Sequence, residues 1–145
     1  YMGDPYSCAF SGKALTFFSS RNLASPELLE QRTIEERIDS VFYSDEYAAA
    51  IVRNTNGEYG SRLEVYKKDG THVLSKEFNF EYTHADFDGD LIILYNEDSC
   101  RIYNMSGTEK FDATFDFPVS RIRKGRFPGT LVVTGPQQMR ELKLH

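Results

Sequence analysis

The sequence predicts an all-β protein built from repeated four-stranded antiparallel sheets, the unit of a β-propeller. Aromatic residues make up 14% of the chain, and Phe and Tyr favour strands. Strand-length apolar runs recur without an amphipathic helix of 10–15 residues between them, which argues against a parallel α/β sheet. One segment also occurs twice at a single offset of 37 residues, which pairs Tyr66 with Tyr103, Gly70 with Gly107, Thr71 with Thr108, Phe78 with Phe115, and Phe80 with Phe117.

The second copy of this segment belongs to the clearest predicted sheet. The apolar run Leu91–Tyr95 has strand length and indicates a strand buried on both faces. Asp88-Gly89, just before it, is typical of a tight hairpin turn. We therefore predict four strands, at 80–87, 91–95, 100–104 and 109–117. Four strands in about 37 residues come close to the period of a propeller blade, on the order of 40 residues.

The flanking segments fit the same template with different loops. Before the clearest copy we predict strands at 38–43, 47–53, 63–66 and 73–80, with an Asn56-Gly57 turn in the loop 54–61. After it we predict strands at 119–122, 131–134 and 140–144, with Pro128-Gly129 between the first two.

The N-terminal part is predicted to be the outer half of an earlier, incomplete copy. Residues 13–19 form one strand in this prediction. Ser25–Glu30 fits one helical turn with Ser25 as N-cap and Pro26 at the first helical position, or a loop leading to a strand at 31–34. We treat 1–145 as one repeat-built domain with a partial blade at about 13–35 and blades at about 38–80, 81–117 and 118–145.

These copies allow two assemblies. The chain forms a small four-bladed ring with one blade made from both termini, or it is part of a larger propeller. Unpaired strand edges in an incomplete propeller favour self-association or association with another fragment. Because the chain begins at Tyr1 rather than Met, we expect it to be a piece of a longer protein.

Composition excludes some classes of function. The net charge is −5, which argues against a general nucleic-acid-binding protein. No run of 18 apolar residues and no signal-peptide pattern occurs, so any membrane association would need an anchor outside this sequence. Cys8 and Cys100 lack metal-site spacing, and we expect two partly buried free thiols.

The segments 88–96 and 102–107 resemble blades of the quinoprotein-like (PQQ-like) and WD40-like propeller superfamily. The chain is most similar in pattern to a bacterial family of propeller ectodomains carried on proteins with an N-terminal membrane anchor. That resemblance implies the fold and an extracytoplasmic, cell-surface location. It implies no activity or cofactor, because the chain has no Trp for either blade motif and no cluster for a quinone.

The nearest approach to a metal motif is a run of acids. Asp86, Asp88, Asp90 and Glu97 stand at positions 1, 3, 5 and 12 of a calcium loop. Position 6 is Leu91 instead of Gly and starts a buried strand, so we favour Asp side chains that stabilise a hairpin turn. The remaining candidates, His72, His84 and His145, have no ligand spacing and are expected to be structural.

Two features are candidates for partner binding. Arg121, Arg123, Lys124 and Arg126 form the main basic cluster, and strand periodicity puts Arg121 and Arg123 on one face. Tyr59 lies in the predicted 54–61 loop, and loops on rigid scaffolds often carry function. The alternatives are a solvated basic rim and an ordinary surface loop.

No Gly-x-Ser-x-Gly elbow or phosphate-binding Gly loop is present, so the sequence supports no catalytic residue. We expect a non-catalytic binding or scaffolding module that recognises a protein or glycan outside the membrane. The alternative is a glycan-active enzyme, for which two inner-strand carboxylates about 5–9 Å apart would be needed. A third class is a structural spacer.

Overall fold

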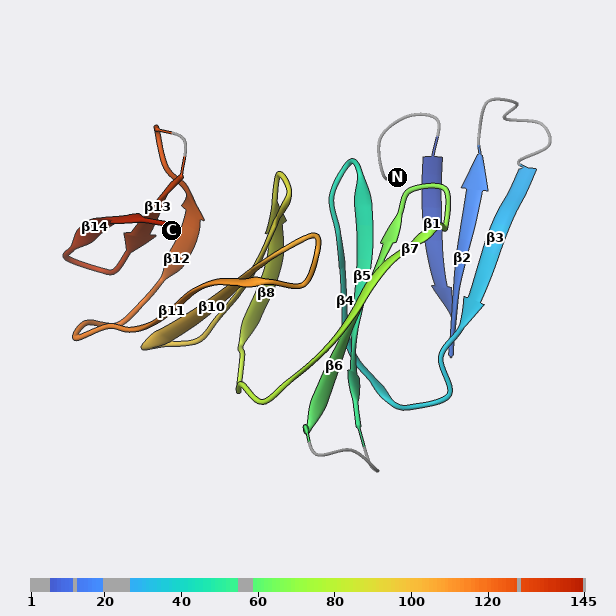
Figure 1. Ribbon diagram of the computed structural model, residues 1–145, viewed down its shortest axis with the longest axis horizontal. Helices are drawn as coiled ribbons and strands as arrows, with labels where there is room; N and C mark the ends of the chain where they lie inside the picture. The colour runs from blue at the N-terminus through green and yellow to red at the C-terminus, as the bar shows by residue number, and fades with distance from the viewer. Residues whose placement is uncertain (1–5, 12, 20–26, 55–58, 128, 145) are drawn as a thin grey trace. The chain divides into compact units, whose positions relative to one another are not determined.

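The computed structural model describes residues 6–11, 13–19, 27–54, 59–127 and 129–144. These residues form fourteen β-strands in four antiparallel sheets and no helix (Figure 1). The predicted fold class, all-β with propeller-type repeats, is confirmed. The chain divides into two units, 1–79 and 80–145.

The first unit holds two sheets in which every strand pairs with its neighbour in sequence. One sheet has the order β1-β2-β3 and the other β4-β5-β6-β7. The strands of the first sheet are β1 (Tyr6–Ser11), β2 (Ala14–Ser19) and β3 (Glu27–Thr33). Those of the second are β4 (Ile38–Tyr43), β5 (Tyr47–Arg53), β6 (Ser61–Lys67) and β7 (His72–Phe78).

Side-chain alternation builds the core between these two sheets. Leu15 and Phe17 alternate with less buried neighbours along β2, as the two-residue period of a strand requires. They pack with Ala48 and Ala50 of β5, whose small side chains allow the facing strand to approach closely. The full buried cluster is Leu15, Phe17, Ile34, Ala48, Ala50, Val52 and Tyr66.

The second unit repeats the plan. Its sheets have the orders β8-β9-β10-β11 and β12-β13-β14. The strands are β8 (His84–Asp88), β9 (Leu91–Tyr95), β10 (Ser99–Asn104), β11 (Glu109–Thr114), β12 (Arg121–Lys124), β13 (Thr130–Thr134) and β14 (Met139–Lys143). Their buried cluster is Ile93, Tyr95, Cys100, Ile102, Phe115, Phe117, Ile122, Leu131 and Val133.

The backbone reproduces the offset of 37 residues. In the β6–β7 turn Gly70 N donates to Lys67 O at 2.9 Å, and in the β10–β11 turn Gly107 N donates to Asn104 O at 3.0 Å. Both glycines have positive φ, +92° and +83°. The ladders β6–β7 and β10–β11 also carry register shifts at equivalent points, Val65/Tyr66 and Ile102/Tyr103. The β2–β3 ladder carries a similar shift at Phe17/Phe18.

Several predicted boundaries were wrong. The strand predicted at 80–87 begins only at His84, and the one predicted at 73–80 ends at Phe78. The helical-turn alternative is wrong for Glu27–Glu30, which belong to β3, while 25–26 lie outside the described residues. The predicted Asn56-Gly57 turn and Pro128 also lie outside them. Strand β1 had no counterpart in the sequence prediction.

Candidate binding pocket

The first wall of the pocket is the turn between β4 and β5. Ser44 N donates a hydrogen bond to Tyr47 O at 2.9 Å. The Ser44 hydroxyl accepts from Glu46 N at 3.3 Å and from Tyr47 N at 3.2 Å. This arrangement is a Ser-stabilised turn, which fixes the backbone of Glu46 and Tyr47 locally.

The second wall is the turn between β6 and β7. Lys67 N donates to Thr71 O at 2.8 Å, and Gly70 supplies the left-handed conformation that this turn needs. The Asp69 carboxylate accepts from Thr71 N at 3.0 Å. Hydrogen bonds from Thr71, chiefly from its backbone N–H, lower the pKa of Asp69. Asp69 therefore stays ionised at neutral pH and rigidifies the turn.

The two turns are tied to each other and to the first sheet. Lys68 N donates to Glu46 O at 3.0 Å, which joins the turns. Arg32 Nε of β3 donates to Gly70 O at 3.0 Å. Gly70 packs so tightly on β3 that an added Cβ would collide with the side chain of Glu30. The pocket walls are thus held in place without any ligand.

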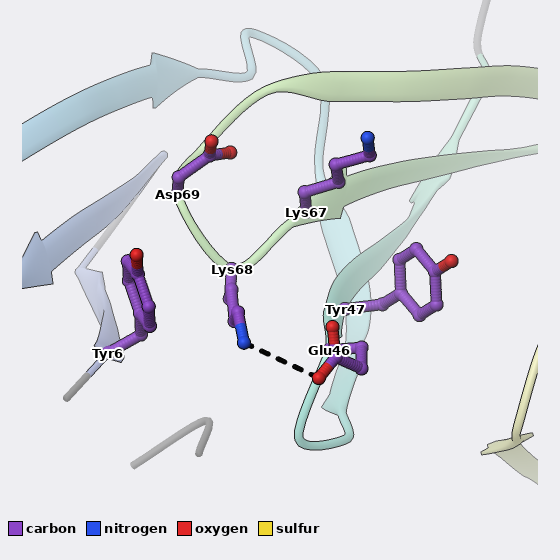
Figure 2. Close-up of a pocket in the computed structure, with 6 residues that line it drawn as sticks. All are labelled: Tyr6, Glu46, Tyr47, Lys67, Lys68 and Asp69. Atoms are coloured by element: carbon purple, nitrogen blue, oxygen red, sulfur yellow. Dashed lines mark hydrogen bonds and ion pairs between the residues drawn. The ribbon is translucent and has the colours of Figure 1, made fainter. Parts of the chain in front are cut away.

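These turns and the start of β1 enclose a pocket of about 260 Å³ (Figure 2). The Lys68 ammonium lies 5.0 Å from the centre of the Tyr6 ring and 3.4 Å from Glu46 Oε1. Tyr47 and Lys67 are cross-strand partners, and Figure 2 shows both side chains pointing away from Tyr6. The side-chain chemistry of the pocket therefore comes mainly from the other lining residues. The six lining residues are Tyr6, Glu46, Tyr47, Lys67, Lys68 and Asp69.

A polar cluster lies on the face of β6 that carries Tyr66. Glu64 is buried, with 8% of its surface exposed, and accepts from Arg62 Nε at 2.7 Å and from the Ser75 hydroxyl. His72 Nε2 lies 2.9 Å from Glu64 Oε2. The Arg62 guanidinium also makes two bonds with Glu36, at 2.8 and 3.1 Å. That interaction lowers the pKa of Glu36 to about 2.

This cluster contains a Ser, a His and a carboxylate but is not arranged as a catalytic triad. In a triad the acid and the Ser approach different nitrogens of the imidazole. Here Ser75 Oγ, at 3.3 Å, and the Glu64 carboxylate both approach Nε2 of His72. The Ser75 hydroxyl moreover donates its hydrogen bond to Glu64. The arrangement therefore neutralises a buried carboxylate and activates no nucleophile.

The predicted basic cluster is exposed in the second unit. Arg121, Arg123 and Lys124 lie on β12 and Arg126 just beyond it, all at the surface. Lys124 N donates to the Asp88 carboxylate of β8, so acidic side chains lie beside this strand.

Tyr59 is 40% exposed and belongs to the first unit. The backbone N–H of its neighbour Gly60 donates a hydrogen bond to Asn79 Oδ1 at 2.6 Å. Tyr59 and the basic cluster on β12 thus belong to different units.

The acidic run is divided between separate elements. Asp86 and Asp88 belong to β8, Asp90 lies in the turn, and Glu97 follows β9. In the described part of the chain no group of three His, Cys, Asp or Glu side chains is placed to hold a metal ion. His84 stacks on Tyr95 at 4.9 Å, and His145 lies outside the described residues.

Both cysteines are free thiols. Burial raises the pKa of Cys8 to about 11 and that of Cys100 to about 12. Neither thiol is therefore a nucleophile at neutral pH. Among the described residues, no helix has the length and apolar character to cross a membrane.

A second pocket, of about 240 Å³, lies in the second unit beside the β13–β14 turn. Its lining is apolar and amide-rich and carries no ionised side chain. The lining residues are Phe117, Pro118, Gly135, Pro136, Gln137 and Gln138.

The fold defines an all-β repeat protein of propeller type, and turns of its first unit line a small pocket. Residues 1–144 match the model of a family of unknown function, DUF5711, and the chain belongs to that family. A comparison with curated proteins found no match.

Two solved structures with TM-scores of 0.53 share the fold at low sequence identity. The computationally designed protein Ika4 has a TM-score of 0.53 and 10% identity over 95% of this chain and 89% of that one. Hydrazine synthase of Kuenenia stuttgartiensis has a TM-score of 0.53 and 7% identity, covering 92% of this chain and 40% of that one. A comparison with Hsv2 of Kluyveromyces lactis gives a TM-score of 0.46 and 9% identity, and covers 95% of this chain and 61% of that one. The chain thus spans less than two thirds of either natural protein.

Proposed function

We propose that the chain is a non-catalytic binding or scaffolding module that recognises a protein or glycan partner. The observation that supports this most is the pocket beside Tyr6, whose two turns are fixed by their own hydrogen bonds. Such preorganisation lowers the entropic cost of binding. Turns and loops on a rigid sheet scaffold are also common binding elements.

Two carboxylates of the first unit, Glu36 and Glu64, favour binding over the glycan-active enzyme. Glycoside hydrolysis needs one carboxyl group that stays protonated near neutral pH and a second that is free to attack or to activate water. Glu36, with a pKa of about 2, is ionised, and both Glu36 and Glu64 are engaged by Arg62. Neither is available as a general acid.

We place the module outside the cytoplasm, on a protein anchored at the cell surface. The support is the resemblance of segments 88–96 and 102–107 to quinoprotein-like and WD40-like blades and to anchored ectodomains. We also retain self-association, or pairing with another fragment, as a proposal. Light scattering, which measures the molar mass in solution, tests this association. A mass of 16.7 kDa, that of one chain, would exclude self-association and pairing with another fragment.

Binding to glycan and peptide arrays tests the function. We expect ligands whose signal falls on Lys68→Ala substitution and is unchanged by Tyr59→Ala, which alters a tyrosine outside the pocket. Mass spectrometry of the bound ligand should show it intact. Conversion of the ligand to a product would contradict the proposal, as would an absence of any ligand sensitive to the pocket substitution.

A further inference from the structure

We propose that the pocket beside Tyr6 binds one uncharged sugar ring of a glycan. This inference rests on the proposed binding function and specifies the ligand class. It follows from a half-buried aromatic ring, an ion pair beside it and a small volume, all at one place in the first unit.

The aromatic face is that of Tyr6, which stands at the start of β1 and is half-buried. The Lys68 ammonium lies over this ring at 5.0 Å, and the Lys68 side chain is 31% exposed. A sugar that stacks on this face therefore displaces the ammonium from it. A sugar ring presents an apolar C–H face to an aromatic ring and hydroxyl groups around its edge. Tyrosine suits such a ligand because its body is apolar and its tip is polar.

The charges around the pocket cancel. Lys68 and Glu46 form an ion pair beside Tyr6, while Lys67 points away from Tyr6 and the Asp69 carboxylate accepts from Thr71 N. An anionic ligand would face the Glu46 carboxylate, and a cationic ligand would face the Lys68 ammonium. An uncharged polyol meets no such opposition.

The same groups supply the hydrogen bonds that a polyol needs. The Lys68 ammonium offers donors and the Glu46 carboxylate, 3.4 Å away, offers acceptors. Neighbouring hydroxyls of one sugar ring can donate to the carboxylate and accept from the ammonium at the same time. Glu46 has 65% of its side chain exposed, so a ligand can reach this pair from solvent.

The volume limits the ligand to a small group. About 260 Å³ lies just below the range of about 300–1,000 Å³ that holds drug-sized molecules. One ring therefore occupies the pocket, and the rest of the glycan lies outside it.

Isothermal titration calorimetry of the full chain tests the proposal. The probes are three uncharged oligosaccharides, chitohexaose, cellohexaose and maltohexaose, and one acidic one, oligogalacturonate. We expect at least one uncharged probe to bind, with an affinity that changes less than about twofold when salt is raised to about 0.15 M, because screening acts on charges. Tyr6→Ala should weaken binding about tenfold, as loss of a central aromatic contact does.

Control variants separate stacking from folding. Tyr6→Phe keeps the ring and should retain most of the affinity, while Tyr43→Ala removes a tyrosine that is 58% exposed outside the pocket and should change nothing. Thermal unfolding of each variant checks that it is folded.

Three outcomes overturn the sugar assignment. Binding of oligogalacturonate alone, with strong salt dependence, would leave the binding function standing and refute an uncharged ligand. A peptide from the array that competes at Lys68 would do the same. If none of the four oligosaccharides binds, the sugar proposal falls, and the binding function falls with it only if the arrays also yield no pocket-dependent ligand.

Discussion

The β6–β7 and β10–β11 hairpins have the same backbone and opposite charges. Glu64 on β6 and Arg101 on β10 occupy equivalent positions 37 residues apart. Their cross-strand neighbours change accordingly, with His72 near Glu64 and Glu109 near Arg101 at 3.7 Å. The repeat therefore preserves a contact between the two strands, while the sign of the central charge differs between Glu64 and Arg101.

The two clusters differ in how well the central charge is satisfied. Glu64 has Arg62, Ser75 and His72 as hydrogen-bonding partners. Arg101 Nε is buried without a hydrogen-bond partner among the described residues, although its guanidinium lies 5.3 Å from the Phe80 ring. A central carboxylate with several donors is stabilised more than a guanidinium held by Tyr103, one distant acid and a ring.

Removal of Glu64 should give the largest effect. Glu64→Ala removes the carboxylate that accepts from Arg62 Nε and the Ser75 hydroxyl, and should lower the free energy of unfolding by about 3 kcal/mol. Arg101→Ala should lower it by about 1 kcal/mol, through lost packing and ring contact. Urea unfolding of both variants measures the difference. Equal losses would mean that the two hairpins are equivalent in energy as well as in backbone.

Gly70→Ala should have the next largest effect and lower the free energy of unfolding by about 2 kcal/mol. The substitution puts a Cβ into left-handed backbone, which costs about 1–2 kcal/mol, and drives it into Glu30 of β3. Gly107→Ala meets the same backbone cost, so the difference between the variants isolates the packing of the β6–β7 turn on β3. A larger loss at Gly107, again in urea unfolding, would refute that packing contribution.

Low pH should destabilise the β6–β7 hairpin, because protonation of Glu36 weakens its interaction with Arg62 of β6. The pKa of Glu36 is lowered from 4.5 to about 2 in the folded chain, so its contribution is full above pH 4.5 and is lost as the pH falls toward 2. Glu36→Gln should remove this dependence. The effect is modest because a third of the Glu36 side chain is exposed. Melting temperature as a function of pH, for both proteins, provides the measurement, and parallel curves would argue against the Arg62 interaction.

The smallest effect is expected from Lys68→Ala. Its ion pair with Glu46 is at the surface and should contribute no more than about 0.5 kcal/mol to stability. A loss above about 1 kcal/mol in thermal unfolding would show that Lys68 holds the turns together. Lys68 would then be a structural residue first, and the array test of ligand binding would need the milder variant Lys68→Arg.

Much of the fold was predictable because turn residues recur at equivalent positions of the repeat. Gly70 and Gly107 are needed for positive φ, and Leu91–Tyr95 is apolar throughout because it is buried on both faces. Strand β1 was missed because its short mixture of small and aromatic residues has no clear alternation. The helical alternative at Glu27–Glu30 failed because pairing with β2 overrides a local N-cap signal.

The sites were less predictable because their residues come from distant segments. Glu36 lies 26 residues from Arg62, and Tyr6 meets Lys68 only once the two sheets are packed. The pattern did point to exposed β12 arginines and to Tyr59, since charge and turn residues mark surfaces. The one available hint of the Glu64 cluster was that a carboxylate interrupts the apolar stretch Leu63–Tyr66.

The sheet orders have a consequence for how the chain folds. Every ladder joins strands that are consecutive in sequence, so each hairpin closes a short loop at low entropic cost. Contacts of this local kind form early and do not wait for distant segments to meet. Folding of the chain should therefore begin independently in several hairpins, and the slower events should be the packing of finished sheets against their neighbours.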